Sequence, residues 1–249
     1  MANAHIQTAH VTVPNEDVQI PAYMARPSTN DSYPGVIVIQ EIFGVNRHIR
    51  DVTERIAQQG YVAIAPAIFH RVAPADFEIG YSAEDVQLGR HYKQQTTAIQ
   101  LLSDIQATIN YLKQLPQASQ RFGCIGFCFG GHVAYLAATL DDIAATASFY
   151  GAGITTQTPG GGSPTITRTA EIKGTIYTFF GMQDASIPAS EVAQIEAALE
   201  NDQISHRVFR YEQADHGFFC DQRASYNAEA AADAWKHVLQ LFQQHLNTG

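Results

Sequence analysis

Residues Arg121 to Gly131 read RFGCIGFCFGG, a short apolar strand that runs into a glycine-rich turn before an apolar helix. The turn follows the pattern G-x-C-x-G, that of a nucleophile elbow with cysteine in place of serine. Such a turn is so tight that its central residue takes a strained conformation and its flanking positions must lack a Cβ atom. Gly126 and Gly130 meet this need, so we predict that Cys128 is a nucleophile, its thiolate favoured by the helix that follows.

A structural role for this cysteine is the alternative. Glycine-rich turns between strand and helix also occur in nucleotide-binding folds, where Cys128 would be a buried, inert residue. Its place after a central strand of an alternating pattern favours the catalytic role. We expect Cys124, within the strand, to be an inert core residue, and Cys220 has no assigned role.

Strands and helices alternate around this turn. A β-hairpin is expected first, from His5–Val13 and Val18–Ala25. Further strands are expected at 36–39, 61–65, 121–126, 145–150, 175–180 and 206–211, and helices at 48–59, 96–115, 130–140, 189–200 and 227–246; the segments 66–85 and 155–169 are expected to be loops. This order predicts an α/β fold with a mostly parallel sheet and helices on both faces. No linker divides the chain, so we expect one domain over 1–249.

The helix at 96–115 has a predicted apolar face. Apolar residues recur in it at steps of three and four, which is typical of a helix with one buried side: Ile99, Leu102, Ile105, Ile109 and Leu112.

A thiol nucleophile needs a base, and the α/β-hydrolase fold supplies its partners in the order nucleophile, acid, histidine. His216 follows the last expected strand and Asp184 follows the strand at 175–180, so both lie at the carboxyl edge of the sheet. The order 128, 184, 216 therefore predicts a catalytic triad in an α/β-hydrolase. The alternatives are a loop histidine without a partner and an aspartate that only caps the next helix.

The segment after the first parallel strand reads Gln40-Glu41-Ile42-Phe43-Gly44-Val45. In this fold one oxyanion donor comes from such an early loop and the other is the amide after the nucleophile. We expect the amides of Ile42 and Phe129 to be these donors. Glu41 is a carboxylate aimed at the thiol, a solvated loop charge, or the partner of Arg47 or Arg50 in a salt bridge.

These segments together resemble the dienelactone hydrolase (carboxymethylenebutenolidase) family over nearly the full length. The matching pieces are 40–44, 126–131, 181–184 and His216-Gly217-Phe218. The resemblance implies a Cys128–Asp184–His216 triad, and a role for Glu41 in contacting the resting thiol and generating thiolate when substrate arrives.

The resemblance also implies substrate-binding residues, for which we take Tyr92, Arg90 and Phe218 as candidates. The chain departs from the family at two positions. Two family arginines that bind a substrate carboxylate correspond to Leu88 and Cys220 here. We therefore expect small anionic lactones to bind weakly, unless Arg90, Arg71 or Arg223 reaches the pocket instead.

The composition and charge of the chain argue against several classes of binding partner. The formal net charge is −9 and basic residues are scattered, which argues against nucleic acid and anionic membranes. No apolar run is long enough to span a membrane, and residues 1–5 do not read as a secretion signal. Three cysteines without framework spacing suit a reducing cytoplasm. We expect a monomer or weak homo-oligomer, no cofactor, and no metal in the reaction, since no paired His or Cys ligand spacing occurs.

The predicted function is hydrolysis of an ester or lactone through the cysteine nucleophile. One alternative keeps the fold and changes the substrate, giving a general carboxylesterase or thioesterase. Another is a non-catalytic redox sensor, in which Cys128 is oxidised rather than acylated.

Overall fold

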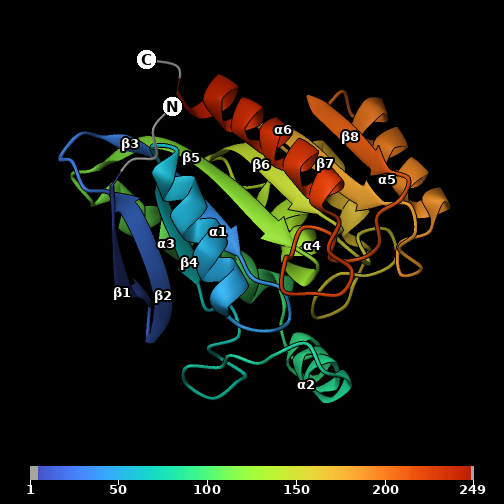
Figure 1. Cartoon of the computed structure of the whole chain (residues 1–249), viewed down its shortest axis with the longest axis horizontal. Coiled ribbons are helices and arrows are strands. Elements are labelled where there is room, and N and C mark those ends of the chain that lie inside the picture. The colour runs from blue at the N-terminus through green and yellow to red at the C-terminus, as the bar shows by residue number, and fades with distance from the viewer. Residues whose placement is uncertain (1–4, 248–249) are drawn as a thin grey trace.

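The computed structural model describes residues 5–247; residues 1–4, where no secretion signal is expected, and 248–249 lie outside the described part. The described residues form an eight-stranded sheet in the order β1-β2-β4-β3-β5-β6-β7-β8 (Figure 1). Its strands are β1 Ile6–Asn15, β2 Val18–Pro27, β3 Tyr33–Ile39, β4 Val62–Pro66, β5 Ala118–Phe127, β6 Ile143–Phe149, β7 Thr175–Gly181 and β8 His206–Tyr211. The hairpin β1–β2 and the pair β2–β4 are antiparallel, and the remaining pairs are parallel. The predicted fold class is confirmed.

Helices cover both faces of the sheet (Figure 1). They are α1 Arg47–Gln58, α2 Ala83–Lys93, α3 Ala98–Lys113, α4 Phe129–Ala137, α5 Ala189–Asn201 and α6 Ala228–Leu246, with a 3₁₀ helix at Thr165–Glu171. The buried sides of α1 and α6 share one apolar cluster with β3 and β6, whereas those of α3 and α4 belong to a second cluster with β1 and β2. The two clusters sandwich the sheet, which explains the continuous apolar runs of its central strands.

Three sequence predictions were wrong in detail. The segment 66–85 was expected to be a loop up to Asp85, but α2 begins at Ala83 and continues to Lys93, where no helix was predicted. The segment 155–169 contains most of the 3₁₀ helix. In α3, Ile99 is 83% exposed and Leu101 is buried in its place.

Each difference has a physical reason. A capping box between Ser82 and Asp85 starts α2, but this helix buries only Gly89 and so shows no apolar periodicity. In α3, Ile99 lies in the first turn, which extends past the edge of the buried surface, so the buried face begins at Leu101.

The parallel strands determine where chemistry can occur. Gln40 follows β3, Cys128 follows β5, Asp184 comes three residues after β7, and His216 comes after β8. These positions all lie at the carboxyl edge of one parallel sheet, where ligand sites of such folds are found.

Candidate active site

Cys128 has a left-handed backbone conformation, with φ of 55° and ψ of −116°, between β5 and α4. A Cβ atom on Gly126 would stand 1.9 Å from the carbonyl oxygen of Gly130, so the turn requires glycine there. The Cys128 amide donates to the carbonyl of Phe149 over 3.0 Å, which fixes the turn on the neighbouring strand. Such a conformation costs about 1–3 kcal/mol in a residue other than glycine. The predicted strained elbow is confirmed.

The elbow lies directly against the end of β3. A Cβ atom on Gly130 would stand 2.3 Å from the carbonyl oxygen of Ile39 and 2.4 Å from that of Gln40. On the other side of this loop, a Cβ atom on Gly89 of α2 would stand 2.4 Å from the carbonyl oxygen of Ile42. The loop that starts at Gln40 is therefore held between two helices, and glycine permits both close approaches.

Two backbone amides beside Cys128 have no backbone acceptor within residues 5–247, so each can bind a negative charge. Phe129 is the first residue of α4, so its amide has no acceptor within the helix. Among the described residues, the loop and turn hydrogen bonds include no backbone acceptor for the amide of Ile42 or of Phe129. The side-chain amide of Gln40 stabilises this loop, because its Nε2 donates to the backbone carbonyl of Glu41 over 3.3 Å.

His216 and Asp184 form a short ion pair. Nδ1 of His216 lies 2.6 Å from Oδ2 of Asp184, whose side chain is almost fully buried. The other carboxylate oxygen, Oδ1, accepts from the hydroxyl of Ser186 over 2.5 Å and from its amide over 2.8 Å. These bonds hold the carboxylate in one orientation, so it can fix the imidazole tautomer. Helix α5 begins after Pro188 without a side-chain cap, so Asp184 is not its N-cap.

The charges around His216 favour its protonated form. Burial lowers the pKa of His216, but the charge of Cys128, the hydrogen bonds with Asp184 and Cys128, and the Asp184 charge together raise it to about 10. Burial opposes ionisation of Asp184, yet its contacts with His216 and Ser186 lower its pKa. The three side chains therefore act electrostatically on one another, as a triad requires.

Glu41 is fully buried and is paired with Arg223 rather than solvated. Its Oε1 accepts from Nη1 of Arg223 over 2.9 Å, while its Oε2 has no partner among the described residues. Burial raises the pKa of Glu41, against the lowering effects of Arg223 and His216. The expected alternative partners are engaged elsewhere, Arg47 with Asp51 at 3.8 Å and Arg50 with Glu78 at 2.6 Å. The solvated-charge interpretation of Glu41 was therefore wrong.

Arg223 contacts Glu41, although its spacing from His216 differs from that of the family arginine. It comes seven residues after His216, whereas the family arginine comes four residues after the histidine. Gly217 makes room for it, because a Cβ atom there would lie 2.3 Å from Nη1 of Arg223. Its guanidinium also lies over the rings of Phe43 and Tyr81. Spacing along the sequence does not predict this contact, because the chain between His216 and Arg223 folds back on itself through successive turns.

The candidate substrate-binding residues occupy different surroundings. Tyr92 belongs to an aromatic cluster with Phe69 and Phe77, and Phe69 stacks on Phe129. Arg90 is exposed on α2. Phe218 is fully buried in the core, where it packs on Phe149, Tyr150 and Tyr211, so its side chain offers no exposed surface to a substrate.

Two further positions from the sequence analysis are Leu88, which replaces a family arginine, and Arg71, an alternative arginine. Leu88 is 40% exposed on α2. Arg71 donates to the buried carboxylate of Asp104 over 2.6 Å, in a cluster that also contains His70 and Asn15. The structure thus assigns Arg71 to packing of the N-terminal hairpin against α3, because Asn15 ends β1 and Asp104 lies on α3.

Sequence analysis did not single out Lys93. Its Nζ lies 5.3 Å from the ring centre of Phe129, and no ion pair of the described residues includes it. Burial lowers the pKa of Lys93, opposed by the charge of Cys128. Lys93 also lines a cavity of about 390 Å³ with Phe129, His132 and residues 156–162. A lone lysine on a loop-flanked helix has no sequence signature, so only its place in the fold reveals it.

The chain matches the sequence profile of a known protein family. The sequence profile of the "Dienelactone hydrolase family" matches residues 20–246. The chain belongs to the dienelactone hydrolase family. It is 58% identical over 242 residues to the "Putative carboxymethylenebutenolidase" of Synechocystis sp., a match that covers 97% of this chain and 98% of that protein.

Other members are similar at lower identity. The "Probable 2-oxo-3-(5-oxofuran-2-ylidene)propanoate lactonase" of Bradyrhizobium sp. is 30% identical, with 90% of this chain and 89% of that protein covered. The crystal structure of a "Putative Dienelactone Hydrolase" from Klebsiella pneumoniae superposes with a TM-score of 0.89 at 30% identity, covering 97% of this chain and all of that one (100%). The protein is thus a dienelactone hydrolase-like hydrolase with the α/β-hydrolase fold. No helix within residues 5–247 has the length and apolar character needed to cross a membrane.

Proposed function

We propose that this dienelactone hydrolase-like protein cleaves an ester or lactone with Cys128 as nucleophile, His216 as acid and base, and Asp184 as the orienting carboxylate. The observation that carries the proposal is the left-handed Cys128 between two obligatory glycines, at the same sheet edge as the His216–Asp184 pair. A cysteine held in a strained turn beside a paired imidazole is what thiol-dependent acyl transfer requires.

In the acylation step, the Cys128 thiolate attacks the carbonyl carbon and a new S–C bond forms. The carbonyl oxygen becomes an oxyanion, which the amides of Ile42 and Phe129 stabilise. When the oxyanion collapses, the C–O bond to the alcohol breaks and protonated His216 donates its proton to the leaving oxygen. The product is a thioester on Cys128 and a neutral imidazole.

In the deacylation step, neutral His216 takes a proton from water and the resulting hydroxide attacks the thioester carbon. The S–C bond then breaks, the carboxylic acid product leaves, and the thiolate and imidazolium are restored. With a lactone, the alcohol released in the first step stays tethered to the acyl group. Deacylation must therefore outpace re-attack by this alcohol.

Glu41 and Arg223 are proposed to adjust the charge near the thiolate. In the observed arrangement Arg223 compensates the Glu41 carboxylate, so Glu41 repels a neighbouring anion less than a free carboxylate would. A substrate carboxylate that took over Arg223 would release Glu41 toward the thiol. This is the movement of Glu41 that the family resemblance implies, and it makes the charge beside Cys128 depend on substrate.

We further propose that the substrate carries a carboxylate, which Arg223 binds in place of the two missing family arginines. Arg223 is the one of the three alternative arginines that contacts a site residue, since Arg71 is engaged by Asp104 and Arg90 is exposed. The Bradyrhizobium relative's name describes a lactonase of a keto-acid lactone, which is consistent with an anionic substrate. Lys93, beside Phe129, is placed to contact a second polar group in the 390 Å³ cavity.

The proposal is tested by trapping the acyl-enzyme. Protein mixed with an aryl acetate, a thioester and a lactone carboxylate in turn is quenched during turnover, and its peptides are mapped by mass spectrometry. We expect an acyl group on Cys128, with the highest kcat/KM for the lactone carboxylate. Higher kcat/KM for aryl acetates or thioesters would favour the general esterase, and no turnover with a Cys128–Cys220 disulfide under peroxide would favour the redox sensor.

A further inference from the structure

Three potential metal ligands from distant parts of the chain meet beside the candidate active site. Glu41 follows β3, His48 lies in the first turn of α1, and Cys220 follows the loop of the catalytic histidine. One ligand atom from each lies within 4.8 Å of the other two, and all three residues are buried. No ligand spacing in the sequence indicates this cluster, because the fold alone brings the three segments together.

Two of these side chains have polar atoms without a partner. Among the described residues, neither Oε2 of Glu41 nor Nε2 of His48 makes a hydrogen bond, although both are buried. The hydroxyl of Tyr150, whose pKa burial, Glu41 and Cys220 together raise, is a third such atom. A buried polar atom without a partner costs about 1–3 kcal/mol. Unused acceptor atoms of two buried side chains in one cluster therefore indicate a missing ligand.

We propose that Glu41, His48 and Cys220 bind a divalent cation of the zinc class. A carboxylate oxygen, an imidazole nitrogen and a thiolate sulfur are the three ligand types that Zn²⁺ takes in proteins. Around a tetrahedral zinc ion, ligand atoms are roughly 3.3–3.8 Å apart. The ligand atoms, now within 4.8 Å of one another, therefore have to approach by at most about 1.5 Å to bind the ion, which rotation of the side chains can supply.

The protonation states of the ligands are compatible with this site. Burial lowers the pKa of His48 to about 3, so its imidazole is neutral and has a free lone pair. Burial raises the pKa of Cys220 to about 11, so the thiol keeps its proton without an ion. Binding then displaces one proton from Cys220 to solvent as the sulfur–metal bond forms. The Cys220 sulfur is otherwise held at 3.3 Å from the hydroxyl of Tyr81.

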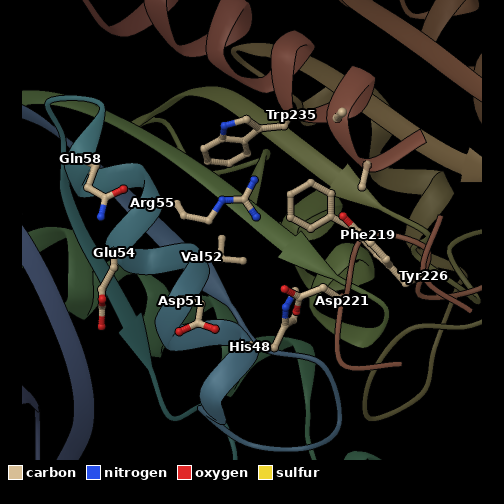
Figure 2. Close-up of a pocket in the computed structure, with 12 residues that line it drawn as sticks. His48, Asp51, Val52, Glu54, Arg55, Gln58, Phe219, Asp221, Tyr226 and Trp235 are labelled. Atoms are coloured by element: carbon tan, nitrogen blue, oxygen red, sulfur yellow. The ribbon is translucent and has the colours of Figure 1, made fainter. Parts of the chain in front are cut away.

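An acidic pocket gives the ion a route to the cluster. A cavity of about 520 Å³ lies between α1 and the segment 219–235, and His48 lines it (Figure 2). Three carboxylates line the same cavity: Asp51, Glu54 and Asp221. Figure 2 shows His48 and Asp221 toward one end of the pocket; Arg55 also lines it, with its guanidinium 4.3 Å from the ring centre of Trp235. The carboxylates attract a cation toward His48.

Arg223 determines what metal binding would change. Arg223 donates to Oε1 of Glu41, so the ion would bind Oε2. The positive charge of the ion would then compete with the guanidinium of Arg223 for the same carboxylate. Binding would thus weaken the Glu41–Arg223 pair. If the proposed role of that pair in hydrolysis is correct, zinc inhibits the enzyme; the binding itself does not depend on the proposed function.

Binding is tested in protein with the Cys128→Ala substitution, so that the nucleophile thiol cannot hold the ion. We expect one Zn²⁺ per chain by competition with a chromogenic chelator, and a sulfur-to-metal charge-transfer band with Co²⁺. Adding Cys220→Ser should abolish this band, and adding His48→Gln should weaken binding at least tenfold. Cys124→Ala, which removes a buried thiol outside the cluster, is the matched control and should change neither.

A second measurement covers the case in which a variant does not fold. Crystals of the unsubstituted protein soaked with Zn²⁺ should show an anomalous peak between Glu41, His48 and Cys220. No binding at micromolar zinc, binding that survives both substitutions, or a peak only at Cys128 and His216 would overturn the proposal. For inhibition, the Cys220→Ser enzyme should keep its basal activity and lose zinc sensitivity, with wild-type activity restored by a chelator.

Discussion

Arg223 donates from Nη1 to Oε1 of the fully buried Glu41 over 2.9 Å, across a separation of 182 positions in the chain. The pair connects the loop after β3 with the segment that follows the candidate catalytic histidine. Among residues 5–247, the other carboxylate oxygen of Glu41 has no partner. The charges near Cys128 therefore depend on contacts that form only in the folded chain.

The first prediction concerns the nucleophile. Replacing Cys128 by alanine removes the attacking thiolate, so ester and lactone turnover should fall at least roughly a thousandfold, as loss of a triad member typically does. Steady-state hydrolysis at saturating substrate measures this. The Cys124→Ala control should keep wild-type turnover, because Cys124 is buried in β5 and contacts Thr146. Near-normal turnover of the Cys128 variant would disprove the proposed nucleophile.

The second prediction concerns Glu41 and Arg223 as a pair. Glu41→Gln removes a negative charge and leaves Arg223 uncompensated, so iodoacetamide should modify Cys128 faster while ester hydrolysis slows. Arg223→Gln leaves a buried carboxylate without its partner, so the same modification should slow. Alkylation rates from peptide mapping give the comparison. Wild-type rates of alkylation and hydrolysis in the Glu41 variant would mean that this carboxylate has no role in tuning the thiol.

The third prediction concerns substrate charge. Wild-type enzyme should prefer a lactone carboxylate over its methyl ester in kcat/KM, because Arg223 supplies a charge-assisted contact worth about 1.5–3 kcal/mol. Arg223→Gln should lower kcat/KM for the carboxylate by roughly tenfold to a hundredfold and leave that for the methyl ester less affected. Arg90→Gln, at an exposed position on the nearby helix, is the control. A preference that survives the Arg223 substitution would assign the carboxylate to another residue.

The fourth prediction concerns Lys93. Lys93→Met keeps the length of the side chain over Phe129 and removes its charge. We expect KM for the lactone carboxylate to rise several-fold with little change for an uncharged aryl acetate, because only the anion loses an electrostatic contact. The measurement is the ratio of the two KM values. An equal rise for both substrates would indicate that Lys93 only packs on the ring.

The fifth prediction concerns pH. Burial lowers the pKa of His216, but Cys128 and Asp184 raise it to about 10. This pKa should fall when Cys128→Ala removes the neighbouring charge. Titration of the His216 ring by NMR measures this shift. Because the unfolded value is about 6.5, protonated His216 stabilises the fold fully below that pH, and the contribution is lost as the pH rises through about 10. The melting temperature should therefore decrease more steeply with rising pH for the wild type than for the Cys128→Ala variant.

Much of the fold was predictable because its signals are local. Alternating strands and helices, the hairpin, and the glycines at 126 and 130 each follow from short stretches, and the structure confirms them. Helix α2 was not predicted because it buries only Gly89 and so shows no apolar periodicity. The apolar face of α3 was predicted to begin at Ile99 and begins at Leu101, since periodicity does not show where the buried surface ends.

The candidate site also contains residues that local sequence signals predict and residues that they do not. The tight turn at Cys128, the order of Cys128, Asp184 and His216, and the loop after β3 were predictable, because strand direction alone sends these to one edge of the sheet. The contacts of Arg223 with Glu41, of Lys93 with Phe129 and of Cys220 with His48 appear only in the folded structure. Those contacts depend on how loops fold back and how helices approach, which no spacing along the chain encodes.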